Sequence, residues 1–203
     1  MRVGCLLVLA VAAAIPLLSA TVPFVGCASD GQTGPIEAPT GKSKQVEISA
    51  ASAQRLAWYE SDLKLRILAP RGWHCFRVYG SSGEALYVSP EPVNAARLFG
   101  HDWTGFAGPL IEISHSDGDT FGRYAVAEII ARMFPAYKQF VTSLIEGGLA
   151  SADEYPSGPY PITGVTILIG PTPDLLHLAI RLPAQLSDLT STIIEEVERT
   201  AGR

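Results

Sequence analysis

Alternating apolar and polar residues predict a series of β-strands in the central and C-terminal parts of the chain. In residues 63–67, Leu and Ile alternate with Lys64 and Arg66, and the segment stops at Ala69-Pro70. Such a period of two is typical of a strand with one buried face. Similar patterns predict strands over 74–79, 84–89, 110–115, 165–169 and 176–182. We expect them to form one antiparallel sheet of about five to seven strands.

Glycine-rich turns separate several of these strands. Gly80-Ser81-Ser82-Gly83 predicts a hairpin between 74–79 and 84–89, and Arg71-Gly72-Trp73 predicts a turn before it. We expect Phe76 and Val78 to share the core face with Leu86 and Val88. In strand 110–115, Ile111 and Ile113 are expected on one buried face. Residues 170–174 predict the turn between the last two strands.

Two segments have the spacing of amphipathic helices. In residues 122–146, apolar side chains recur every three or four positions, with a kink expected at Pro135 and an end at Gly147-Gly148. A proline-rich loop over 149–163 follows. Residues 188–200 predict a last helix, capped by Ser187 or Asp188. Strands with segregated helices predict an α+β fold in which the helices pack on one face of the sheet.

The N-terminal region has a different pattern. Arg2 precedes an apolar stretch that begins at Val3 and ends near Leu18, and Pro16 and Ser19-Ala20 interrupt it. A positive start, an apolar core and small residues are typical of an export signal. The longer stretch Val3–Val25 could also span a bilayer of about 30 Å as a retained anchor.

Val25-Gly26-Cys27 resembles the cleavage box of bacterial lipoproteins, although Phe24 stands where leucine is usual. The resemblance implies that residues 1–26 are a signal peptide and that Cys27 becomes the first mature residue, with lipid attached. It also implies a place in the bacterial cell envelope, with the domain in the periplasm. Ala28 is compatible with the outer membrane. A signal cleaved without lipidation remains an alternative.

Residues 27–45 are poor in large apolar side chains and rich in Gly, Pro, Ser and Thr. Such a composition predicts a flexible tether. Residues 46–203 are then long enough for a single α+β domain with its own core.

Charge excludes one class of partner. The formal net charge is −5, and the 15 Lys and Arg residues are scattered along the chain. Because phosphate neutralisation needs a basic patch, we expect no nucleic-acid binding. Attachment to acidic lipid through basic residues is not expected either.

The three cysteines allow two interpretations. Cys5 lies in the predicted signal and Cys27 in the lipid-attachment position, which leaves Cys75 as a lone thiol and a weak candidate nucleophile. Its neighbour His74 would point to the opposite side of a strand and cannot easily serve as its base. Free cysteine is more often a buried structural residue, which we favour. Without lipid on Cys27, a Cys27–Cys75 disulfide becomes possible.

His115 is the other weak catalytic candidate. With Asp117 and Asp119 it has the residue types of a metal site, but the segment lacks the length and distal Glu of a calcium loop. We favour a turn and predict no metal and no cofactor. Backbone N–H groups of Thr120–Arg123 could receive an anion, which the two aspartates would repel. His101-Asp102 and His177 are predicted at the surface, and no common catalytic signature occurs.

Several motifs resemble a set of uncharacterised bacterial exported proteins. They are Leu68–Cys75, Tyr79–Gly83, Val126–Arg132 and Ala179–Pro183. The resemblance implies no known activity, and relatives carry a longer segment where Pro161 meets Ile162 here. Our first hypothesis is a lipid-tethered, non-enzymatic domain that binds an envelope protein or a small ligand. The alternative is a cysteine-dependent envelope hydrolase that uses Cys75.

Overall fold

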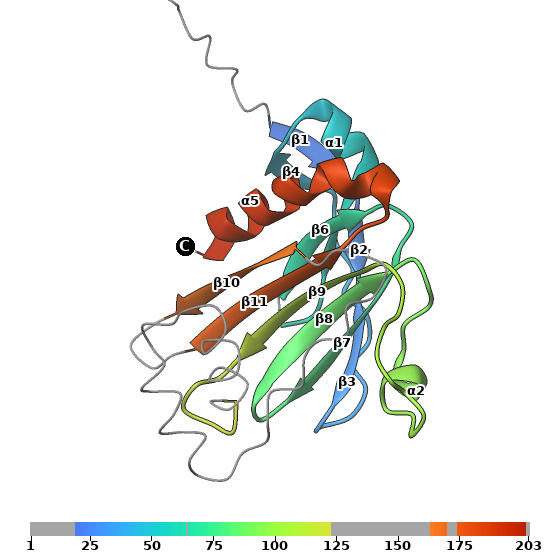
Figure 1. Ribbon diagram of the computed structural model, residues 1–203, viewed down its shortest axis with the longest axis vertical. Coiled ribbons are helices and arrows are strands. Elements are labelled where there is room, and N and C mark those ends of the chain that lie inside the picture. Colours follow the sequence, from blue (N-terminus) through green and yellow to red (C-terminus); the bar gives the residue numbers. More distant parts are fainter. Residues whose placement is uncertain (1–18, 64, 123–162, 170–173, 202–203) are drawn as a thin grey trace, which may run out of the picture.

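A computed structural model describes residues 19–63, 65–122, 163–169 and 174–201 (Figure 1). The predicted helix over 122–146, beyond its first residue, lies outside this part of the chain. So do residues 149–162 of the predicted loop and residues 170–173 of the last turn.

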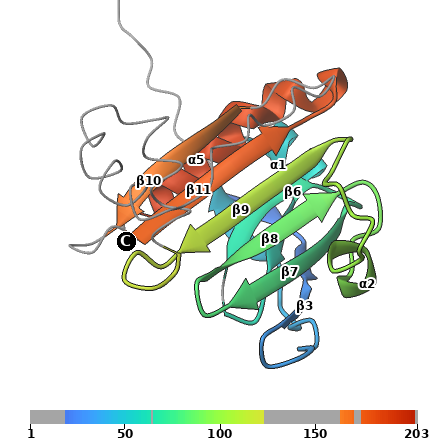
Figure 2. The ribbon, with the colours of Figure 1, turned by 60° about the horizontal axis from the view of Figure 1, so that its bottom comes forward.

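A six-stranded sheet forms the body of the fold, in the order β10-β11-β9-β8-β7-β3 (Figure 2). Its strands are β3 (Ala28–Gly31), β7 (His74–Gly80), β8 (Gly83–Ser89), β9 (Leu110–Ser116), β10 (Thr163–Ile169) and β11 (Asp174–Arg181). The predicted number of strands and the α/β content are therefore confirmed. The purely antiparallel arrangement is wrong, because β3 pairs with β7 in parallel.

Smaller sheets and a helix cover one face of this sheet. A three-stranded sheet contains β2 (Phe24–Gly26), β5 (Leu56–Glu60) and β6 (Arg66–Pro70), and a two-stranded sheet joins β1 (Ser19–Val22) to β4 (Lys44–Glu47). Helix α5 (Thr190–Ala201) contacts β6, β10 and β11 (Figure 1). Helix α1 (Ala50–Arg55) contacts β1 and β5.

The helices are not confined to one face, which corrects a second prediction. Helix α2 (Ala95–Leu98) belongs to a separate apolar cluster with Phe76 and Val93. Phe76 lies on the side of β7 that faces away from the main core, so α2 covers the face opposite to α5. The main core is formed by apolar side chains of several layers, including Leu56, Ile67, Leu86, Val88, Ile111, Leu178 and Ile193.

The hairpin is confirmed, but its predicted core face is wrong. Gly80 pairs with Gly83 across a two-residue turn, so Phe76 lies opposite Tyr87 and Arg77 lies opposite Leu86. Leu86 and Val88 belong to the main core, whereas Phe76 and Val78 belong to the cluster at α2. Turn length sets register, and a shift of one residue moves a whole strand to the other face.

Other sequence predictions are confirmed with shifted ends. Ile111 and Ile113 are buried in β9 as expected. Strand β6 begins at Arg66, so the predicted strand residue Leu63 precedes it and is 63% exposed. The turn at 71–73 is present, and the Tyr59 hydroxyl fastens it by donating to Pro70 O and accepting from Trp73 N.

The last helix also differs at its start. Residues Ala184–Leu189 form a 3₁₀ helix, η2, and α5 follows from Thr190. The predicted caps have other partners: the Ser187 hydroxyl donates to Ala184 O, and the Asp188 carboxylate pairs with Arg55. Ile193 and Val197 on α5 are buried.

The N-terminal boundary is the largest correction. Residues 27–45 were predicted as a tether, but Cys27 is fully buried, β3 joins the large sheet and β4 joins β1. Residues 19–47 therefore belong to the fold, and a domain start at residue 46 is wrong. The physical reason is that strand pairing and a disulfide between Cys27 and Cys75 hold this segment in place, so it needs few large apolar side chains.

Candidate functional site

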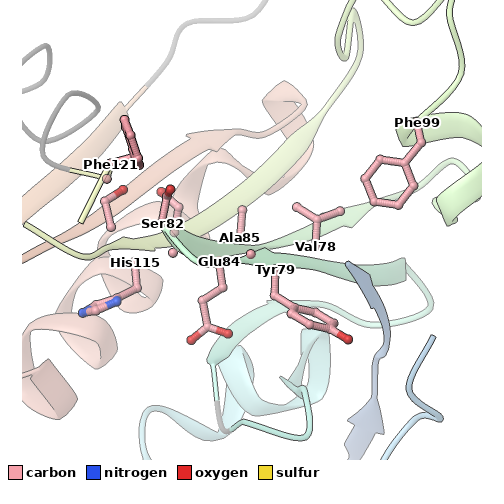
Figure 3. A pocket seen from close by; sticks show the side chains of 13 residues that line it. Val78, Tyr79, Ser82, Glu84, Ala85, Phe99, His115 and Phe121 are labelled. Atoms are coloured by element: carbon pink, nitrogen blue, oxygen red, sulfur yellow. The ribbon is translucent and has the colours of Figure 1, made fainter. Parts of the chain in front are cut away.

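Polar side chains gather on the face of the large sheet that the smaller sheets and α5 cover, at the end formed by the turn of the β7–β8 hairpin. Tyr79 lies opposite Glu84, and Glu84 lies opposite His115 in the neighbouring pair. Figure 3 shows these three side chains on one side of the sheet and Val78 and Ala85 on the other. Strand alternation therefore places a tyrosine, a carboxylate and an imidazole in one row.

A buried arginine holds the inner side of this row. Arg77 is 1% exposed, and its guanidinium donates to the carboxylates of Asp62 (2.7 Å) and Glu84. It also donates to Ser29 Oγ at 3.4 Å and lies over the Tyr79 ring. The two carboxylates balance its charge, as a buried cation requires. This network joins β3, β7, β8 and the turn after β5.

His115 and two carboxylates form a second group at the edge of the row. His115 Nδ1 lies 3.4 Å from Asp117 Oδ1. The donor atoms of His115, Asp117 and Asp174 all lie within 4.8 Å of one another. Asp174 Oδ1 also accepts from Gly118 N at 2.8 Å, which ties the start of β11 to the turn after β9. Asp119, predicted beside His115, is not part of this group.

The segment after β9 forms a turn, as predicted. The Thr120 hydroxyl donates to Asp117 O and accepts from Gly122 N. Gly122 is required sterically, because a Cβ at this position would lie 2.2 Å from Ser82 O. The turn thus lies against the β7–β8 hairpin and fixes Asp117 beside the strands.

Two hollows border these residues. A smaller one of about 180 Å³ is lined by Leu63, Arg77, Glu84, His115 and Asp117, among others. A larger, shallow one of about 430 Å³ runs along the other side of the hairpin, past Val78 and Ala85. Phe99 and Phe121, which are 58% and 72% exposed, also line the larger hollow (Figure 3).

The predicted lipid-attachment residue, Cys27, and the candidate nucleophile, Cys75, are bonded to each other. Cys27 and Cys75 form a disulfide with Cα atoms 5.3 Å apart. Cys75 therefore has no thiolate in this structure and cannot act as a nucleophile. His74 is exposed and belongs to the other side of β7, as predicted.

The disulfide also bears on the predicted lipid attachment. A sulfur in a disulfide cannot carry a thioether-linked lipid, so the described fold and lipidation of Cys27 exclude each other. Cleavage before Cys27 would also remove β1 and β2, including the fully buried Val22. Lipidation stays a prediction for a chain that is processed before it folds.

The remaining histidine predictions have mixed outcomes. His101 and Asp102 are exposed as expected. His177 is only partly exposed, which corrects its predicted surface position, and burial lowers its pKa. It lies on the α2-side face of β11, where the neighbouring Leu175 is fully buried. This face of β11 is therefore partly shielded from solvent near His177. Strand alternation identified the face correctly but wrongly predicted that it is exposed.

Sequence reasoning missed four polar residues: Arg77, Glu84, Glu112 and Asp174. Glu112 is partly buried on the face opposite Ile111, and burial raises its pKa to about 6, against a lowering effect of Arg181. A charged residue in the middle of an apolar strand is the signal that could have identified both Arg77 and Glu112. Asp174 gave no such signal, because its role depends on the pairing of β11 with β9.

Within the described residues, no helix has both the length and the apolar character needed to cross a membrane. Comparison with known proteins adds no assignment: no protein-family model, curated protein or solved structure matches this chain.

Proposed function

We propose that this chain is an exported protein of the bacterial cell envelope that binds a partner protein or small ligand and catalyses no reaction. The Cys27–Cys75 disulfide carries the proposal. Disulfides persist in oxidising compartments such as the periplasm and are rare in the cytosol. The apolar run that follows Arg2 has the character of an export signal and supports the same compartment.

Two forms of the exported protein compete for one sulfur atom. In the first, Cys27 pairs with Cys75 and residues 19–31 stay in the fold. In the second, Cys27 carries lipid and tethers the domain to the membrane, and Cys75 is a free thiol. We favour the first form, because Cys27 is fully buried and its backbone N–H donates to Glu60 O at 2.9 Å.

The absence of a free Cys75 thiol argues against the hydrolase alternative. A cysteine hydrolase needs a thiolate with a base in hydrogen-bond reach. With Cys75 in a disulfide, the alternative requires reduction of a bond whose Cys27 partner is fully buried. A binding role requires no such step.

The shallow hollow along the hairpin is the surface best suited to a partner. Its floor includes Val78 and Ala85, and Phe99 and Phe121 present exposed rings beside it. Exposed aromatic side chains are enriched at interfaces, where they supply apolar contact area. Ser82, Ser114 and Ser116 add polar groups to its lining.

Intact mass of protein extracted from bacterial envelope fractions tests the compartment and the sulfur chemistry together. We expect a chain without lipid whose cysteines at 27 and 75 react with a thiol reagent only after reduction. A lipid adduct on Cys27 with a reactive Cys75 would overturn the disulfide form. Recovery of reduced protein from the cytosol alone would overturn export.

A turnover assay separates binding from hydrolysis. We expect no hydrolysis of peptide or peptidoglycan-type amides by the purified chain, under oxidising or reducing conditions. Hydrolysis that appears on reduction and is lost in Cys75→Ala would replace the binding role with the hydrolase.

A further inference from the structure

We propose that His115, Asp117 and Asp174 form a site for Zn²⁺ or a chemically similar divalent transition metal. The three side chains come from the end of β9, the turn after it and the first residue of β11. In the described part of the chain, they are the one group of three His, Cys, Asp or Glu side chains whose donor atoms meet this closely. The inference depends neither on export nor on a partner that binds the larger hollow beside Val78 and Ala85.

The sheet register brings the three residues together. In the pairing of β11 with β9, Leu176 lies opposite His115 and Leu175 lies opposite Ser116. Continuing this register places Asp174 beside Asp117, where the two strands separate. The contact therefore follows from backbone pairing across 56 residues of sequence, as the Asp174–Gly118 hydrogen bond shows.

The distance between His115 and Asp117 fits two ligands of one ion. In a tetrahedral Zn²⁺ site with bonds of about 2.0–2.1 Å, neighbouring donor atoms lie about 3.3 Å apart. His115 Nδ1 and Asp117 Oδ1 are 3.4 Å apart, which is longer than a normal N–H···O hydrogen bond. Asp174 offers a carboxylate oxygen within 4.8 Å of both other donor atoms, so a small approach of the three side chains would complete the ligand set.

The nearby charges also favour a cation. Two carboxylates that approach each other this closely repel, and a bound cation removes that repulsion. The buried Arg77, which lines the same hollow as His115 and Asp117, is already paired with Asp62 and Glu84. The Gly118 N–H donates to Asp174 Oδ1 and orients that carboxylate, as outer contacts do in metal sites.

The ligand types select the metal class. One imidazole nitrogen and two carboxylate oxygens suit Zn²⁺, whereas Ca²⁺ takes six to eight oxygens and Mg²⁺ keeps octahedral oxygen ligands. Three protein ligands leave a fourth position for water. His115 and Asp117 line the hollow of about 180 Å³, which gives that water access to solvent.

Calorimetric titration with Zn²⁺ tests the site. The full chain carries Cys5→Ser in every sample, so that no free thiol competes for the metal. We expect one Zn²⁺ per chain, and a loss of affinity of about tenfold or more in each of His115→Ala, Asp117→Asn and Asp174→Asn. Titration with Co²⁺ should give a visible absorption band that His115→Ala abolishes.

Matched controls come from the same chain. His101→Ala removes an exposed histidine, and Asp119→Asn removes the neighbouring carboxylate that lies outside the group. Both should bind Zn²⁺ as tightly as the parent. Thermal unfolding in EDTA shows whether each variant is folded, and added Zn²⁺ should raise the Tm of the parent and controls but not of His115→Ala.

Three results would overturn the site. The first is that the folded parent binds no Zn²⁺. The second is that all three ligand variants bind Zn²⁺ as tightly as the parent. The third is that the parent binds Ca²⁺ in preference to Zn²⁺. Because the readout is metal affinity of purified protein, failure here leaves the proposed compartment and binding role untouched.

Discussion

The covered face of the large sheet is apolar and buried at one end and polar at the other, although the same strands form both ends. At one end, Cys75, Val88 and Ile180 belong to a dry core closed by the Cys27–Cys75 disulfide. At the other end, the same strands present Tyr79, Glu84 and His115 beside a hollow. One face of one sheet is therefore a core at one end and a polar site at the other.

The difference lies in what covers the strands. Strands β5 and β6 and helix α5 supply apolar side chains above the first end, including Leu56, Leu68 and Ile193. Above the second end the cover includes Asp62 and the exposed Leu63, from the turn between β5 and β6. A strand pattern sets which face a residue occupies, but the opposing layer decides whether that position is dry.

Removal of the disulfide should have the largest effect on this comparison. Cys27 and Cys75 are 48 residues apart, and a cross-link over such a loop contributes about 3–4 kcal/mol by restricting the unfolded chain. We expect Cys27→Ala/Cys75→Ala to lower the free energy of urea unfolding by this amount. Reduction of the parent should give the same loss.

Cys5→Ser is the matched control, since it removes a cysteine outside the bond and should leave urea unfolding unchanged. A loss below about 1 kcal/mol in the double variant would mean that pairing of β2 and β3 holds the segment without the covalent link.

Loss of Arg77 should be the next largest effect, now at the polar end. Arg77→Met keeps much of the side-chain volume but leaves Asp62 and Glu84 without their shared cation. Removal of one partner from a buried charge network costs about 3–5 kcal/mol. The carboxylates are 22% and 19% exposed, so we expect about 2–3 kcal/mol in chemical denaturation.

Arg55→Met provides the comparison for Arg77→Met. The Arg55 pair with Asp188 lies at the surface, where solvent screens the attraction, so we expect a much smaller loss than in Arg77→Met. Equal losses in the two variants would show that the Arg77 network is hydrated and that the polar end has no buried charge.

The strand pattern predicted much of this sheet. Alternation identified β7, β8, β9, β10 and β11, and turn residues identified the hairpin. The method missed β1 to β5, and it failed most clearly for β2 and β3, whose residues include Gly26, Ser29 and Asp30. Their pairing depends on β5 and β7, partners far away in the sequence, and a short polar strand has no periodicity that predicts this.

The site could be predicted only in part for a related reason. His115 and Asp117 were identified as neighbours in sequence, but Asp174 joins them through the register of β11 on β9. Arg77 was missed because the hairpin register was taken one residue wrong, which placed Phe76 on the core face. Local patterns give residue types and faces, and long-range pairing brings them together.

Neutralising Glu112 should have the smallest effect and the opposite sign. Burial raises its folded-state pKa to about 6, above the ordinary value of 4.5 for an unfolded chain. A raised carboxyl pKa means that the folded state holds its proton longer, so its stabilising effect is present below pH 4.5 and is lost as the pH rises through about 6. At pH 7 the ionised side chain therefore destabilises the fold.

Glu112→Gln should then raise the free energy of unfolding by about 1–2 kcal/mol at pH 7, since one pKa unit corresponds to about 1.4 kcal/mol. The gain should disappear near pH 4, where the parent carboxyl is protonated in both states. Burial also lowers the pKa of His177 on the same face, so the parent-minus-variant difference is the quantity to measure at each pH. A destabilised Glu112→Gln at pH 7 would mean that the attraction of Arg181 outweighs burial, as the Asp62 and Glu84 contacts do for Arg77. Buried charge on both faces would then be balanced by partners, and the dry end would differ from the rest of the sheet through its apolar cover and the disulfide.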